Sequence, residues 1–192
     1  MMRSVWMLTV LVMAWPAGAQ PLSERLPTCQ ACHGANGASA IPTVPSLGGM
    51  PANYTLTQLY LFRGGVRKAD PMNAMAAGLT DDDLRALGKL FNETPPPPPA
   101  PPLGTADEQA GAALVEKYHC NSCHGPNLAG QSTIPHIAGQ HATYVEQALI
   151  GYKTNARQGY SPAMNEAAQP IAEDEIPLLA KYIASFRPVA AD

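Results

Sequence analysis

A five-residue pattern, Cys-x-x-Cys-His, occurs twice in this chain and uses all of its cysteines. The first copy spans Cys29–His33 and the second spans Cys120–His124, and the chain has four cysteines in 192 residues. Two cysteines three positions apart lie about one helical turn from each other, and the histidine follows them directly. Each motif therefore offers two sulfurs and one ring nitrogen to a single ligand, and that ligand constrains how the surrounding chain can fold.

The two motifs belong to a longer internal repeat. They are 91 residues apart, and the same alignment pairs Tyr54 with Tyr144 and Leu79 with Ile171, at offsets of 90 and 92. A repeat of this kind indicates two similar domains. Both domains would be small, and only 6% of the residues are aromatic. A large planar cofactor would supply the missing bulk in each core.

A proline-rich stretch, PPPPPAPP at Pro95–Pro102, separates the two copies. Proline fixes the backbone and removes donors, so this stretch cannot lie inside a helix or sheet. We expect an extended spacer of about 25 Å, at roughly 3.1 Å per residue; a ligand for a proline-reading module is the alternative. The predicted organisation is a signal peptide at 1–19, two similar domains at 20–94 and 103–192, and a Pro-rich linker at 95–102.

The N-terminus has the pattern of a secretion signal. Arg3 precedes an apolar run over Val5–Trp15, and Ala17-Gly18-Ala19 is a small-residue cleavage site. We expect cleavage after Ala19 and export to a bacterial periplasm. The alternative is an uncleaved membrane anchor, but the apolar region is shorter than the roughly 20 residues that span a bilayer.

Each half predicts helices joined by loops, which makes the fold class all-α. No stretch shows the alternation of apolar and polar residues that is typical of strands. Two sequences, Thr80–Asp83 and Thr105–Glu108, have the pattern of capping boxes that begin helices. The expected helices cover approximately residues 22–26, 53–63, 81–91, 105–118, 143–153 and 176–183.

The Cys-x-x-Cys-His pattern is typical of covalent c-type haem attachment. The two cysteines can form thioethers with the vinyl groups of one porphyrin, and the histidine then lies beneath the ring. Three alternatives remain: a zinc site built from both cysteine pairs, a redox-active dithiol, and two local disulfides. The haem reading predicts two covalent haem c groups, held by Cys29, Cys32 and His33 and by Cys120, Cys123 and His124.

A methionine opposite the histidine would complete the iron coordination and suit electron transfer. The second domain has one methionine, Met164, which lies 40 residues after His124. In the first domain Met72 lies 39 residues after His33, in the corresponding position. We therefore predict Met72 and Met164 as the second axial ligands, with Met75 as the alternative to Met72.

Other residues have expected supporting roles. Carbonyl groups near Pro45 and Pro135 are candidate acceptors for the imidazole N–H of each motif histidine. His119 is expected at the surface, and His136 and His141 in supporting or surface positions. A further set recurs in both halves and could bind haem propionates or form a solvated face: Tyr54, Arg63, Arg67, Tyr144, Lys153 and Arg157.

These residues together resemble class I c-type cytochromes, and specifically the dihaem cytochrome c4 family. The resemblance rests on CQACHGANG and CNSCHGPN, on the paired segments Pro45–Gly49 and Pro135–Gly139, and on the methionines with the acidic helices that follow them. It implies helical domains, each wrapped around one haem, with the axial pairs His33–Met72 and His124–Met164. The proline spacer looks longer and stiffer than the usual link of the family, which puts close coupling of the two haems in doubt.

The resemblance implies a periplasmic electron carrier between a respiratory donor and a terminal oxidase or reductase. The expected donor is a quinol-oxidising complex or a dehydrogenase, and docking to a membrane complex is a further expectation. Alternatives are a permanent electron-transfer subunit of a larger dehydrogenase or oxidase, and a dihaem enzyme of the peroxidase or thiosulfate dehydrogenase type. The net charge is −3, with a neutral first half and an acidic second half, so neither half has the basic excess of a nucleic-acid binder.

Overall fold

Helices and irregular loops make up the fold. The computed structural model describes residues 21–159 and 161–187, so the expected signal peptide at residues 1–19 lies outside the described residues. Within the described ranges the one β-type feature is an isolated bridge between Gln131 and Ile134. The helices are α1 Leu22–His33, α2 Ala52–Arg63, α3 Met72–Ala76, α4 Asp81–Glu93, α5 Thr105–Lys117, α6 Cys120–His124, α7 Ala142–Lys153, α8 Ala163–Ala168 and α9 Ile176–Ser185.

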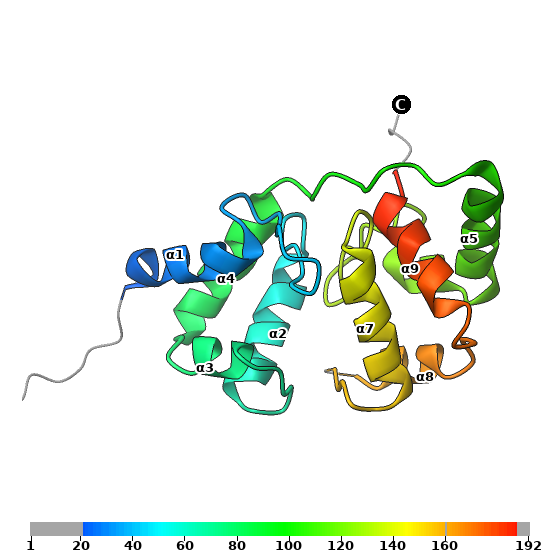
Figure 1. Ribbon diagram of the computed structural model, residues 1–192. Helices are drawn as coiled ribbons and strands as arrows, with labels where there is room; N and C mark the ends of the chain where they lie inside the picture. Colours follow the sequence, from blue (N-terminus) through cyan, green and yellow to red (C-terminus); the bar gives the residue numbers. More distant parts are fainter. Residues whose placement is uncertain (1–20, 160, 188–192) are drawn as a thin grey trace, which may run out of the picture.

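The helices form two groups that repeat one arrangement (Figure 1). In the first half α2 packs against α4, and in the second half α7 packs against α9. Each half has its own apolar core, one centred on α2 and α4 and the other on α5, α7 and α9. The all-α fold expected from the sequence is confirmed.

Helix α4 shows how sequence determines these elements. The Thr80 hydroxyl accepts a hydrogen bond from the Asp83 backbone N–H at 3.1 Å, and the Asp83 carboxylate accepts one from the Thr80 backbone N–H at 2.8 Å. This predicted capping box satisfies two donors that the first turn would otherwise leave free. Leu84, Leu87 and Phe91 then follow at helical spacing and are buried in the first core.

Two expectations for helix boundaries were wrong. Helix α5 begins at Thr105 itself, after Gly104, and no side chain caps it, so Thr105–Glu108 is not a capping box. Helix α1 does not end at Leu26 but continues through Pro27 to His33. A proline removes one backbone donor, and the residues after Pro27 still form helical hydrogen bonds, so the first Cys-x-x-Cys-His motif lies on a long helix.

The proline segment runs from α4 to α5 along one side of the molecule, while α2 and α7 face each other between the two halves (Figure 1). Residues 95–104 have no regular secondary structure. The segment lies directly on the first half: a Cβ on Gly48 would meet the Pro95 carbonyl oxygen at 2.1 Å. It also contacts the second half, where the Ala100 N–H donates to the Ala184 carbonyl at 2.8 Å.

The two halves also contact each other directly. The Ser46 backbone exchanges hydrogen bonds with the Gln140 side chain, and the His141 Nε2 donates to the Ser39 carbonyl at 2.8 Å. A stiff proline segment is thus compatible with close packing, because it lies along the two halves instead of holding them apart. Among the described helices, none has the length and apolar character needed to cross a membrane.

Replacing Thr80 with alanine tests the role of the capping box. Thr80→Ala removes the acceptor for the Asp83 N–H, so we expect the free energy of unfolding to fall by about 0.5 to 2 kcal/mol. Thr105→Ala is the matched control, because Thr105 begins a helix without capping it, and its effect should stay within about 0.5 kcal/mol. Denaturant unfolding of the haem-loaded protein, followed by helical circular dichroism, measures both. Equal effects of the two variants would contradict the assignment.

Candidate functional site

The four motif cysteines lie on two helices, one in each half. Cys29 and Cys32 are on α1, Cys120 and Cys123 are on α6, and all four thiols are unpaired. In each pair the first cysteine is half-buried and the second is exposed. Burial raises the pKa of the Cys29 thiol, against a lowering effect of nearby Arg25, and burial likewise raises the pKa of the Cys120 thiol.

The alternatives to haem attachment do not fit this arrangement, and local disulfides are not formed, since all four cysteines are unpaired. A redox-active dithiol is favoured by a thiol with a lowered pKa, and burial instead raises the pKa of the half-buried thiol of each motif. A zinc site would need a cluster of three or more ligands from His, Cys, Asp or Glu, and residues 21–159 and 161–187 contain none. The cysteine pairs lie in separate halves and serve separate sites.

Each motif histidine is buried and held in one orientation. The Nδ1–H of His33 donates to the Pro45 carbonyl at 2.8 Å, and that of His124 donates to the Pro135 carbonyl at 2.9 Å. A carbonyl only accepts, so Nδ1 carries the proton and Nε2 keeps a free lone pair. The expected role of the two proline carbonyls is confirmed.

Burial lowers the pKa of both His33 and His124, although the hydrogen bonds to the proline carbonyls oppose this shift. Both imidazoles are therefore neutral near pH 7. A neutral imidazole with a fixed Nδ1–H is the form that binds a metal through Nε2. The two histidines thus present the same ligand geometry in each half.

The candidate methionines occupy matching places. Met72 is the first residue of α3 and packs partly buried against the first core. Met164 lies in the first turn of α8 and packs against the second core, which Cys120 also borders. Met75 is 40% exposed. This burial pattern favours Met72 over Met75 as a buried ligand.

An asparagine that follows each methionine was missed by the sequence analysis. The Asn73 Nδ2 donates to the carbonyl groups of Phe62 and Arg67, both at 2.8 Å. The Asn165 Nδ2 donates in the same way to the carbonyl groups of Tyr152, at 3.1 Å, and Arg157, at 2.9 Å. Each asparagine ties the methionine helix to the end of the preceding long helix. The Met-Asn pair, repeated at an offset of 92, is the signal that could have identified it.

In the first half a further contact joins the motif helix to the methionine region. Arg25 of α1 donates to the Gly78 carbonyl at 2.5 Å and to the Met75 carbonyl at 2.8 Å. The chain segment that follows Met72 is thereby fixed against the helix that carries Cys29.

A cationic cluster lies where the halves meet. Arg67 is buried against the Phe62 ring and approaches the Tyr144 hydroxyl of the other half at 3.5 Å. Arg157 lies over the rings of Tyr144 and Tyr152, and its Nε is buried without a hydrogen-bond partner.

The pKa values of two tyrosine hydroxyl groups beside this cluster are shifted in opposite directions. Burial opposes ionisation of Tyr144, but Arg157 and Arg67 outweigh it and lower the pKa of Tyr144 to about 8. Burial raises the pKa of Tyr54, on the facing helix, to about 12.

This cluster fits the carboxylates of a haem. In the described part of the chain neither Arg67 nor Arg157 forms an ion pair with a carboxylate, and a buried guanidinium without an anion is costly. Of the six residues expected to bind propionates or form a solvated face, Arg63 and Lys153 have other partners, Asp81 and the Gln169 carbonyl. Two imidazoles with free Nε2 atoms, two thiol pairs and this unpaired positive charge together suit two haems.

The remaining histidines do not join the site. His119 is exposed, as expected. His136 is buried and its Nε2 donates to the Ala138 carbonyl at 2.9 Å, while His141 bonds across the interface. Both histidines thus form hydrogen bonds within the fold, and neither lies fully exposed at the surface.

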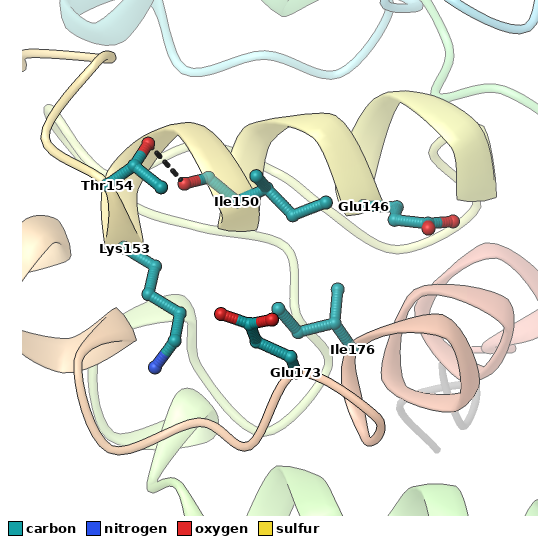
Figure 2. Close-up of a pocket in the computed structure, with 6 residues that line it drawn as sticks. All are labelled: Glu146, Ile150, Lys153, Thr154, Glu173 and Ile176. Carbon is teal, nitrogen blue, oxygen red and sulfur yellow. Dashed lines mark hydrogen bonds between the residues drawn. The ribbon is translucent and has the colours of Figure 1, made fainter.

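A pocket on the second half is separate from these residues. It lies between α7 and the turn before α9, and the Lys153 and Glu173 side chains extend into it (Figure 2). Its lining residues are Glu146, Ile150, Lys153, Thr154, Glu173 and Ile176. None of them is a predicted thioether or iron ligand, and Lys153, a candidate for a propionate, donates instead to the Gln169 carbonyl at 2.7 Å.

Comparison with known proteins agrees with the site geometry. The sequence pattern of the family described as Cytochrome c matches residues 22–89 and 108–187, once in each half. The chain is similar to a cytochrome c4 of Pseudomonas aeruginosa, with 32% identity over 164 residues, covering 81% of this chain and 82% of that protein. It is also similar to a thiosulfate dehydrogenase electron acceptor of Stutzerimonas stutzeri, with 31% identity over 180 residues, covering 88% of this chain and 82% of that protein.

The arrangement of the whole chain matches a solved structure as well. Reduced recombinant cytochrome c4 from Pseudomonas stutzeri superposes with a TM-score of 0.78 and 26% identity. The match covers 90% of this chain and 100% of that one, so it includes both halves.

The asparagine contacts give a testable prediction. Asn165→Ala leaves the Tyr152 and Arg157 carbonyl groups without their donor, so we expect a loss of about 1 to 3 kcal/mol in unfolding free energy. Asn53→Ala is the control, since Asn53 is exposed and should change stability by less than about 0.5 kcal/mol. Guanidinium titration of the haem-loaded variants measures both. If Asn165→Ala is as stable as the control, the asparagine does not anchor the methionine helix.

Proposed function

The chain belongs to the cytochrome c family as a dihaem, cytochrome c4-like member with two covalently bound haems, and we propose that it carries electrons between a donor enzyme and a terminal oxidase or reductase in the periplasm. The observation that carries this proposal is the pair of buried, neutral histidines with fixed Nδ1–H groups and free Nε2 atoms. The small-residue cleavage site at Ala17–Ala19 supports export.

The site geometry supports a set of ligands that we propose for the two haems. We assign thioether attachment to Cys29 and Cys32 in the first half, and to the corresponding cysteines of the second half, Cys120 and Cys123. We assign the axial pairs His33–Met72 and His124–Met164. The boundaries of the two domains, 20–94 and 103–192 on either side of a linker at 95–102, are part of this proposal.

The haem supplies a one-electron iron couple, and the protein determines how that couple is used. A histidine and a methionine on each iron leave no open position for a substrate, which favours an electron carrier over an enzyme. The Pro45 and Pro135 carbonyls orient the imidazoles, and Arg67 and Arg157 offer positive charge for the propionates. Both histidines are buried, which limits the access of water to the imidazole rings.

The donor class is suggested by a relative. A similar protein of Stutzerimonas stutzeri is named a thiosulfate dehydrogenase electron acceptor. We propose that a dehydrogenase of this class is one donor of the present chain. A free carrier is reduced in collisions and leaves, whereas a permanent subunit would remain bound to its dehydrogenase.

Rapid mixing tests the carrier role. The oxidised protein is mixed with thiosulfate dehydrogenase from Stutzerimonas stutzeri and thiosulfate, and haem absorbance is followed. We expect reduction of both haems, with a rate proportional to dehydrogenase concentration, because a carrier reacts by collision. Bacterial membranes that contain a terminal oxidase should then reoxidise the protein. Thiosulfate without the dehydrogenase is the control. Equal rates of haem reduction with and without the dehydrogenase, or no reduction in the complete mixture, would contradict the proposal.

The methionine ligands can be tested separately. Met72→Ala should open one coordination position, so the reduced variant should bind carbon monoxide at one haem, and the reduction potential of that haem should fall because the methionine ligand raises it. Met164→Ala should do the same at the other haem. Met75→Ala is the matched control, and its absorption spectrum should not respond to carbon monoxide. Carbon monoxide binding by Met75→Ala but not by Met72→Ala would assign Met75 as the ligand instead.

A further inference from the structure

Gln140 forms an unusual contact between the two halves. It lies in the loop before α7 of the second half and is 2% exposed. Its Oε1 accepts a hydrogen bond from the Ser46 backbone N–H at 2.9 Å, and its Nε2 donates to the Ser46 carbonyl at 2.9 Å. Ser46 belongs to the first half and is 1% exposed. The Gln140 side-chain amide therefore pairs with the backbone of one buried residue, as a second peptide would.

The Ser46 N–H belongs to the same peptide group as the Pro45 carbonyl. That carbonyl accepts the Nδ1–H of His33 at 2.8 Å. One planar peptide group thus joins His33 on its oxygen side to Gln140 on its nitrogen side. A hydrogen bond donated by a peptide N–H increases the electron density on the carbonyl oxygen, so bonds in such a chain strengthen one another.

The second half lacks an equivalent contact. The corresponding peptide joins Pro135 to His136, and its carbonyl accepts the Nδ1–H of His124 at 2.9 Å. Within residues 21–159 and 161–187, the backbone N–H of His136 donates no hydrogen bond. Met50 occupies the position that corresponds to Gln140, at an offset of 90, and has no amide to offer. The two histidines therefore donate the same hydrogen bond to a proline carbonyl. They differ in the next hydrogen bond, which the peptide N–H donates to a side chain of the other half only at Ser46.

We propose that Gln140 is a positioning residue that lowers the reduction potential of the first haem from across the interface. Its bond to the Ser46 N–H makes the Pro45 carbonyl a stronger acceptor. A stronger acceptor on Nδ1 makes His33 a more basic ligand, and a more basic ligand favours the oxidised state of the metal. The inference rests on the proposed role of His33 as an axial ligand.

The contact also has a consequence for electron exchange within the molecule. In that exchange one half is oxidised by one electron, the other is reduced by one electron, and no other reactant takes part. Gln140 biases this balance toward reduction of the second half. Because the bias depends on a hydrogen bond between halves, it exists only while the halves are docked.

The test uses the haem-loaded protein and Gln140→Met, which places in the second half the residue found at the matching position of the first. We expect the reduction potential of the first haem to rise. In the half-reduced protein, the distribution of the electron should shift about twofold to tenfold toward the first half. A tenfold shift corresponds to about 59 mV for one electron. Nuclear magnetic resonance of haem methyl groups during stepwise reduction resolves the two haems.

His141→Phe is the matched control. It removes another hydrogen bond between the halves, to the Ser39 carbonyl, without touching the Pro45–Ser46 peptide. The first haem should keep its potential in this variant. Equal shifts in both variants would mean that any loosening of the interface changes the potential, and would overturn the role of Gln140. An unchanged or lowered first-haem potential in Gln140→Met would also overturn it.

A measurement on the unaltered protein keeps the proposal testable if Gln140→Met fails to fold. The Ser46 amide proton should exchange with solvent far more slowly than the exposed amides of the same loop. Exchange at the rate of an exposed amide would show that the bond is absent. Failure of the carrier proposal would appear instead as absence of reduction by thiosulfate dehydrogenase, which these experiments do not use.

Discussion

The hydrogen bond from each motif histidine to a proline carbonyl is the contact on which the rest of the structure depends. It joins the helix that carries the cysteines to the loop that carries Pro45 or Pro135. By fixing the proton on Nδ1, it leaves Nε2 free to bind iron in both halves. The same two loops also contact each other across the interface between the halves, so ligand orientation and domain packing are parts of one arrangement.

The interface makes two similar halves unequal. The repeat gives each half a histidine, a methionine and an asparagine at matching positions. The bonds between Gln140 and Ser46, however, support the histidine loop of the first half and have no counterpart at His136 among the described residues. The proline segment lies along both halves, with Gly48 allowing it to approach closely. A two-electron carrier gains from such inequality, because unequal sites release their electrons in a defined order.

Local patterns in the sequence predicted the elements that depend on local physics. The Thr80–Asp83 capping box, the long helices and the acceptors for the histidines follow from neighbouring residues, and the structure confirms them. The extent of α1 was wrong because Pro27 costs one bond and does not end the helix. Asn73 and Asn165 recur in the repeat, but an asparagine is not a haem ligand, so the search for ligands passed over them. Gln140 meets Ser46 across 94 positions of the chain, and no local pattern reveals such a contact.

The central claim is that each half is built around one covalently attached haem. The most direct measurement is the intact mass of the mature protein, produced in cells that attach haem c and then treated with acidified acetone to extract any free haem. The account predicts a mass increase of two haems per chain that survives extraction, and of one haem when Cys120 and Cys123 are both replaced by alanine. A haem that is removed by extraction, or a count other than two in the unaltered chain, would contradict it.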